Sequence, residues 1–114
     1  MRHRKKRHLR GDKDRRRKEL RALCAAAVLY ERITTTKARA KLTQSAVEKM
    51  ITRGKKGGLT AIRILAADLP RNAVKKIMEV YAPRYQARAG GYTRIIHVGK
   101  YKDGTDKVML EFVK

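Results

Sequence analysis

Positive charge crowds the start of this 114-residue chain and limits what that segment can fold into. Residues 1–18 contain eleven Lys or Arg against two Asp. Adjacent like charges repel and their head groups stay hydrated, so such a segment cannot build a hydrophobic core. Its natural partner is a polyanion, because each Lys or Arg that meets a phosphate releases condensed counterions. A net charge of +21 and a pI near 10.9 for the whole chain are typical of proteins that bind DNA or RNA.

The length and composition predict a basic arm followed by one domain. We place the arm at residues 1–11 and a single domain at residues 12–114, where a hydrophobic content of 42% for the chain allows one modest core. The arm has two alternative interpretations, a solvated tail and a membrane-surface segment. The density of charge favours an arm that folds onto a polyanion. A membrane role would need an amphipathic face or a lipid anchor, and neither is present.

Composition also argues against several other classes of protein. Cys24 is the only cysteine and lies in an apolar run, which indicates a buried thiol without a disulfide. His3, His8 and His97 show no metal-ligand spacing, so no metal or cofactor is expected. The acidic residues are scattered singly and no catalytic motif is recognisable, so we expect no enzyme. No stretch has the length of a membrane span or the pattern of a secretion signal, and a cytoplasmic location follows by elimination.

Hydrophobic spacing predicts a helix over residues 13–30, with Asp12 as its N-cap. Its apolar face would hold Leu20, Leu23, Cys24, Ala27 and Tyr30. The β-branched run at residues 32–36 then predicts a short strand.

Three further helices are expected in the middle of the chain. The first would run over residues 37–53, capped by Thr36 and ended by Gly54, with a basic loop at residues 55–58. The second would cover residues 60–69 and stop at Pro70, and the third would be capped by Asn72 and end before Pro83.

The last third changes to an alternating pattern. Residues 92–98 and 107–113 are expected to be strands, joined by a loop containing Asp103 and Gly104. Val108, Leu110 and Phe112 would share one face. The fold class is therefore α+β, a small mixed sheet of about three strands packed on about four helices, with an extended basic N-terminal arm.

A second candidate binding segment lies at residues 84–94, where three Arg are interleaved with two Tyr and a Gly-Gly pair. Glycine allows backbone N–H groups to approach a phosphate closely. Arg offers a fork for phosphate oxygens, and Tyr a flat face for an unstacked base. The alternative is a simple turn into a strand; the surrounding charge favours binding.

The hydroxyl-rich segment Thr34 to Lys37 could also contact sugars or phosphates. We prefer to interpret it as a strand followed by a helix cap. His97 is interpreted as a surface residue of a strand.

Four stretches of the chain resemble a known family. They are Met1-Arg2-His3-Arg4-Lys5-Lys6, Glu31-Arg32-Ile33-Thr34-Thr35-Thr36, Arg39-Ala40-Lys41 and Arg88-Ala89-Gly90-Gly91-Tyr92-Thr93-Arg94-Ile95. In this order the stretches resemble the bacterial large-subunit ribosomal protein family numbered seventeen, over the whole chain. The arm departs from the family pattern, because Arg7-His8 and Arg15-Arg16-Arg17 stand where members have a Gly and a His-Arg pair.

The resemblance implies a structural ribosomal protein without catalysis, bound to large-subunit ribosomal RNA on the side where the peptide tunnel opens. It also implies neighbouring large-subunit ribosomal proteins as partners, and no membrane or small-molecule substrate. Two rivals remain, a free-standing DNA- or RNA-binding regulator and a small RNA-processing enzyme. The residues expected to contact RNA are Arg2, His3, Arg4, Lys5, Lys6, Arg7, His8, Arg10, Lys13, Arg15, Arg16, Arg17, Thr35, Thr36, Lys37, Arg39, Arg84, Arg88, Gly90, Gly91, Tyr92 and Arg94.

Overall fold

The structure is a computed structural model that describes residues 11–114, so all but the last residue of the predicted arm lies outside the described part. Its elements are α1 (Lys13–Tyr30), β1 (Arg32–Thr36), α2 (Lys37–Lys56), α3 (Gly58–Ala66), α4 (Arg71–Lys76), the π-helical turn η1 (Ile77–Tyr81), α5 (Ala82–Arg84), β2 (Thr93–Lys100) and β3 (Asp106–Phe112). α4, η1 and α5 follow one another without a gap and form one continuous helix. The predicted order of helix, strand, three helices and two strands is therefore confirmed.

The three strands form one sheet in the order β1-β3-β2, and both neighbouring pairs are antiparallel. The α+β class is confirmed, but the sheet is antiparallel throughout instead of mixed. The reason is that β2 and β3 form a hairpin and β1 joins the free edge of β3, so the two strands that point the same way never touch. β2 also runs two residues beyond the predicted end, past a bulge between His97 and Gly99.

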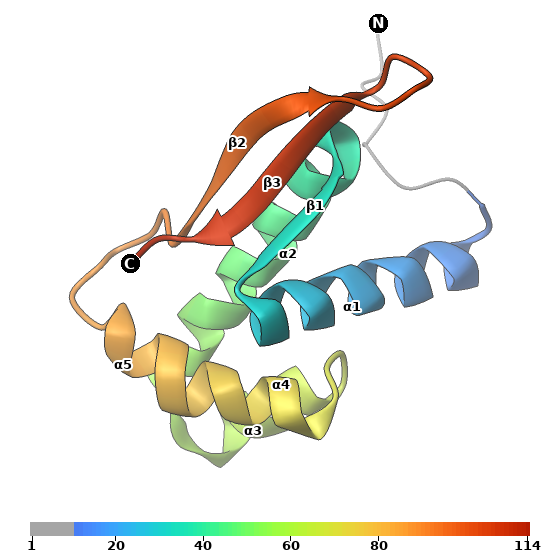
Figure 1. The fold of residues 1–114 in the computed structure, drawn as a ribbon. Helices are drawn as coiled ribbons and strands as arrows, with labels where there is room; N and C mark the ends of the chain where they lie inside the picture. The colour runs from blue at the N-terminus through green and yellow to red at the C-terminus, as the bar shows by residue number, and fades with distance from the viewer. Residues whose placement is uncertain (1–10) are drawn as a thin grey trace, which may run out of the picture.

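The core lies on one face of this sheet. Val108, Leu110 and Phe112 alternate along β3 and are all buried, as the sequence pattern predicts. α2 crosses this face, and the remaining helices pack beyond it, while no described helix covers the opposite face (Figure 1). The sheet is therefore covered on one side only.

α1 begins as predicted, because the Asp12 carboxylate accepts a hydrogen bond from the backbone N–H of Arg15 at 2.8 Å. Cys24 is buried, as expected. The expectation for Tyr30 is wrong: it is 74% exposed and does not belong to the apolar face. Glu31 adopts a left-handed backbone conformation (φ 64°) that turns the chain into β1. The last turn of α1 therefore projects beyond the core.

α2 does not end at Gly54, and Lys55 and Lys56 are not in a loop. The helix runs to Lys56, and Gly57 ends it by donating its N–H to the carbonyl of Gly54 at 3.0 Å. Gly54 is buried where α2 meets η1, and a Cβ there would lie 2.7 Å from Cγ2 of Ile77. Gly54 therefore allows α2 and η1 to pack closely, and it does not end α2.

The next two helices start earlier than expected. α3 covers 58–66 instead of 60–69, and Leu69 closes the following turn through the carbonyl of Leu65. α4 begins at Arg71 with Pro70 as its N-cap, so Asn72 lies inside the helix. The carbonyl of Pro70 accepts the N–H groups of Ala73 and Val74, each at 3.1 Å, so the first helical hydrogen bonds start at Pro70. The Asn72 side chain still accepts the N–H of Ala73, at 2.9 Å, from a position inside the helix.

Pro83 lies within the last helix instead of beyond its end. A proline ring normally clashes with the carbonyl four residues earlier. Here the preceding turn widens, and the N–H of Ala82 donates to the carbonyl of Ile77, five residues back. The π-helical turn makes room for the ring and lets the helix continue to Arg84.

Candidate nucleic-acid interface

The described residues carry a large excess of positive charge over negative. Residues 11–114 hold 25 of the 31 Lys and Arg and all ten acidic residues of the chain. Several carboxylates are engaged internally, in pairs such as Glu19 with Arg39 at 3.0 Å and Asp68 with Arg21 at 3.3 Å. Among residues 11–114 the remaining cations have no acidic partner within 4.0 Å, and those on α1 and α2 define the candidate interface.

The first half of α1 gathers one group of these cations. It consists of Lys13, Arg15, Arg16, Arg17 and Lys18, all exposed except for the half-buried Arg16. None of them has an acidic partner within 4.0 Å among residues 11–114. The Asp12 carboxylate caps the N-terminal end of this helix and Asp14 lies in its first turn, so the positive potential here comes from the excess of five cations over these two acids. This part of the surface favours an anion.

The junction of β1 and α2 is mainly structural. Thr35 is buried, and the hydroxyl of Thr36 accepts the N–H of Arg39 at 3.4 Å. The guanidinium of Arg39 pairs with Glu19 at 3.0 Å and ties α2 to α1. The preferred interpretation of this segment as a strand and a helix cap is confirmed, and Lys37 is left as an exposed cation.

The Gly-Gly loop at residues 88–92 is held against α2 by two side chains. Glu48 accepts the N–H of Gly91 at 3.2 Å and the hydroxyl of Thr93 at 2.7 Å. Lys55 donates to the carbonyl of Arg88 and, at 3.0 Å, to the hydroxyl of Tyr92. The N–H of Gly91 is thus engaged inside the protein and does not point at a ligand. Gly90 remains open, since a Cβ there would meet nothing within 4 Å.

The two tyrosines of this segment cannot stack on an RNA base. Tyr85 is 2% exposed and Tyr92 1% exposed, and their rings pack in the core with centroids 5.1 Å apart. The proposed stacking role is therefore wrong for both. Sequence reasoning missed their burial because the partners that cover them come from other parts of the chain, such as Lys55 on α2.

A cavity of about 330 Å³ opens between α2 and the Gly-Gly loop. It is lined by Glu48, Lys49, Thr52, Arg53, Lys56, Gly90 and Tyr92. Lys49, Arg53 and Lys56 were not among the expected contacts, although their spacing of four and three residues places them on one helix face. We call this row of three cations with the facing loop the α2 groove. It combines positive charge with an open backbone at Gly90, which suits a phosphate.

Two other predicted residues lie away from the α2 groove. Arg94 projects from the uncovered face of the sheet, pairs with Glu111 at 2.5 Å and keeps a side chain that is 60% exposed. Arg84 pairs with Glu31 at 3.0 Å and lies over the ring of Tyr81. The predicted contacts Arg2, His3, Arg4, Lys5, Lys6, Arg7, His8 and Arg10 lie outside the described residues.

The described part of the chain offers little for chemistry. It contains no group of three or more His, Cys, Asp or Glu that could hold a metal ion. Within the same residues no helix is both long and apolar enough to cross a membrane. Burial, aided by the nearby charge of Asp68, raises the pKa of Cys24 to about 12, which makes its thiol unreactive.

The fold and this surface define a small, strongly basic α+β protein of the nucleic-acid-binding class. The particular family follows from sequence comparison: the family described as Ribosomal protein L17 matches residues 19–113, and the chain belongs to it. It is therefore a ribosomal protein of bacterial type, a structural component of the cytoplasmic ribosome and not an enzyme.

Similar proteins come from several bacteria. A protein named large ribosomal subunit protein bL17 from Thermodesulfovibrio yellowstonii is 44% identical, and the match covers 99% of this chain and 87% of that protein. The protein of the same name from Caldanaerobacter subterraneus is 49% identical over 88% of this chain and 91% of its own length. That of Rhodopseudomonas palustris is 46% identical over 80% of this chain and 67% of its own length.

Proposed function

We propose that this chain is a structural constituent of the large ribosomal subunit that binds the ribosomal RNA of that subunit. The observation that carries the proposal is the group of cations on the first half of α1, which have no acidic partner within 4.0 Å among residues 11–114, in a chain that belongs to a ribosomal protein family. The α2 groove and the basic residues 2–10 extend the same charge. Nearly all of these contacts would be to phosphates, which give affinity without reading the base sequence.

The α2 groove adds a second kind of contact. Lys49, Arg53 and Lys56 supply charge on one side, while Gly90 leaves room for a phosphate to approach the backbone on the other. Lys37, at the start of α2, and Arg88, in the Gly-Gly loop, are exposed and would add further single contacts. Thr35, Thr36 and Arg39 support the fold, and we do not propose that they contact RNA directly.

Binding of large-subunit ribosomal RNA at several salt concentrations tests the proposal directly. We expect the affinity to fall by orders of magnitude between ~50 and ~200 mM salt, as for other proteins with many phosphate contacts. Duplex DNA of equal length serves as the competitor. A salt-independent affinity, or tighter binding of the DNA than of the RNA, would contradict RNA binding of this type.

Sedimentation of a cell lysate separates the ribosomal proposal from a free regulator. A structural constituent should travel with the large subunit and be scarce at the top of the gradient. A free-standing regulator would remain mostly in the light fractions.

We also propose neighbouring large-subunit proteins, around the opening of the peptide tunnel, as partners. The support is three exposed apolar side chains of α3, Leu59, Ile62 and Ile64, which lie on different sides of this short helix. Such side chains gain little from RNA phosphates but fit a protein surface. Chemical cross-linking of purified large subunits, followed by mass spectrometry, should link α3 to proteins at the tunnel opening.

A further inference from the structure

Tyr30 is the most exposed of the five tyrosines of the chain. Its 74% exposure leaves the ring uncovered at the end of α1, whereas Tyr81, Tyr85 and Tyr92 are buried in the core. A large aromatic side chain gains nothing from such a position in the folded protein. An uncovered ring beside basic residues is a stacking surface for a base that has left its helix.

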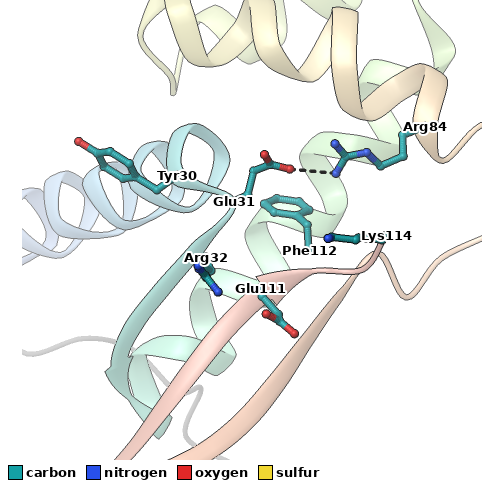
Figure 2. A pocket seen from close by; sticks show the side chains of 7 residues that line it. All are labelled: Tyr30, Glu31, Arg32, Arg84, Glu111, Phe112 and Lys114. Carbon is teal, nitrogen blue, oxygen red and sulfur yellow. Dashed lines mark hydrogen bonds and ion pairs between the residues drawn. The ribbon is translucent and has the colours of Figure 1, made fainter.

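Tyr30 stands at the rim of a cavity of about 520 Å³ (Figure 2). The cavity lies where the end of α1, the start of β1, the end of β3 and α5 come together, and its other lining residues are Glu31, Arg32, Arg84, Glu111, Phe112 and Lys114. The residues that line this cavity and the residues that line the α2 groove do not overlap. The two sites are therefore separate.

The cations of this cavity favour an anion, and its carboxylates offer acceptor oxygens to hydrogen-bond donors of a ligand. Arg84 already pairs with Glu31, and Arg94 pairs with Glu111. Arg32 and Lys114 have no acidic partner within 4.0 Å among residues 11–114, so their charge is available to a phosphate. The oxygens of Glu31 can accept further hydrogen bonds from amino groups of a base.

The backbone around Tyr30 is held in place before any ligand arrives. Glu31 has a left-handed conformation that non-glycine residues rarely adopt, and its carbonyl accepts the N–H of Phe112 at 3.0 Å. The ring of Phe112 in turn stacks on Tyr81, with centroids 4.2 Å apart. The end of β3 therefore fixes the turn that presents Tyr30, which lowers the cost of ordering the site on binding.

We infer that this cavity binds one unstacked nucleotide of ribosomal RNA, with its base on the ring of Tyr30 and its phosphate near Arg32 or Lys114. The acceptors of Glu31 suit a base with an exocyclic amino group, that is adenine, cytosine or guanine. A protein partner is the less favoured occupant, because most of the lining is charged and both carboxylates already have cationic partners. The inference rests on the proposed function and adds a base contact to phosphate binding.

The test compares two variants of Tyr30 with one control in binding to in vitro transcribed large-subunit ribosomal RNA. Tyr30→Phe keeps the aromatic face and should bind like the unchanged protein. Tyr30→Leu removes it and should weaken binding roughly 5- to 150-fold, the equivalent of about 1–3 kcal/mol for one stacked base. Its salt dependence should stay the same, because no phosphate contact is lost. Tyr101→Leu, at the distant hairpin, should have little effect.

Chemical probing of the RNA with dimethyl sulfate gives a second readout. One unpaired base should be protected by the unchanged protein and by Tyr30→Phe, and exposed with Tyr30→Leu. Equal affinity and equal protection for both Tyr30 variants would overturn the inference. So would unchanged RNA binding with loss of a protein cross-link, since the cavity would then hold a protein. Failure of the unchanged protein to bind this RNA would instead overturn the proposed function, and the inference with it.

Discussion

Single residues of this protein carry conformations and charges that only their neighbours explain. Glu31 is one example, because its left-handed backbone joins α1 to β1 while its carboxylate meets cations from another part of the chain. The hydrogen bond from Arg84, with the charge of Lys76, lowers the pKa of Glu31 below its usual value in spite of partial burial. The ionised form is therefore favoured in the folded protein.

Replacing Glu31 with Gln should lower stability at neutral pH but not in acid. A depressed pKa contributes stability above the ordinary value of 4.5, and this contribution is lost as the pH falls through the folded pKa. Because the pair is about half exposed, we expect a loss of at most about 1 kcal/mol at pH 7. Urea unfolding of both proteins at pH 7 and pH 2.5 measures it. A difference that persists undiminished in acid would rule out the ion pairs as its cause.

The two glycines of the loop should respond differently to alanine. Gly91 has a φ of 65°, so Gly91→Ala should cost about 1–2 kcal/mol of stability. Gly90→Ala should leave the melting temperature unchanged, because its Cβ meets nothing and its φ is not in the left-handed region. Gly90→Val extends this test by blocking the approach of a phosphate, and it should weaken RNA binding more than stability. If RNA binding follows the melting temperature across all three variants, the loop is only a turn.

At the scale of elements, close packing places α2 against the helix that contains η1. Gly54 lies at the crossing, and its missing side chain lets Ile77 approach the backbone of α2. Helix propensity alone would favour alanine at a position inside a helix. The observed glycine is explained by the contact instead.

Gly54→Ala should therefore destabilise the protein despite the better helix propensity of alanine. The new Cβ would stand 2.7 Å from Cγ2 of Ile77, which is fully buried, and overpacking of this kind costs about 1–3 kcal/mol. Ile77→Leu removes the methyl group in question. In a double-mutant cycle of unfolding free energies, Gly54→Ala should cost less in the Ile77→Leu background. Additive effects would mean that another contact sets the cost.

In the whole molecule, the proposed RNA contacts and the proposed protein contacts lie on different helices. The cations are on α1 and α2, and the exposed apolar side chains are on α3. This separation predicts that the position of charge matters beyond its total amount. The three cations of the α2 groove provide the sharpest case, because they are exposed and alanine suits a helix.

The triple variant Lys49→Ala, Arg53→Ala, Lys56→Ala should fold normally but bind RNA more weakly. The slope of log K against log salt should become shallower by about two to three, because each lost phosphate contact removes a little under one from the slope. A control with Lys100→Ala, Lys102→Ala and Lys107→Ala removes the same charge from the distant hairpin and should bind more tightly than the test variant. Equal losses in the two variants would show that only net charge matters.

Much of this fold follows from local sequence signals. Asp12 and Thr36 mark the starts of two helices, the β-branched residues 32–36 form β1, and the alternation along β3 identifies its buried face. The basic character of the first half of α1 was likewise evident. These features depend on hydrogen bonds and side-chain preferences within a few residues, which the sequence displays directly.

Tertiary structure alone decided the rest. Tyr30 and Tyr92 are both tyrosines near positive charge. Tyr30 is exposed at the end of a helix, whereas Tyr92 is buried beside α2. Gly54 matches a helix-ending signal but serves a helix crossing, and Pro83 sits inside a helix because a widened turn accommodates it. In each case the outcome depends on contacts between residues far apart in the chain. Local pattern fixes which elements form, and long-range packing determines which of their side chains remain free to bind RNA.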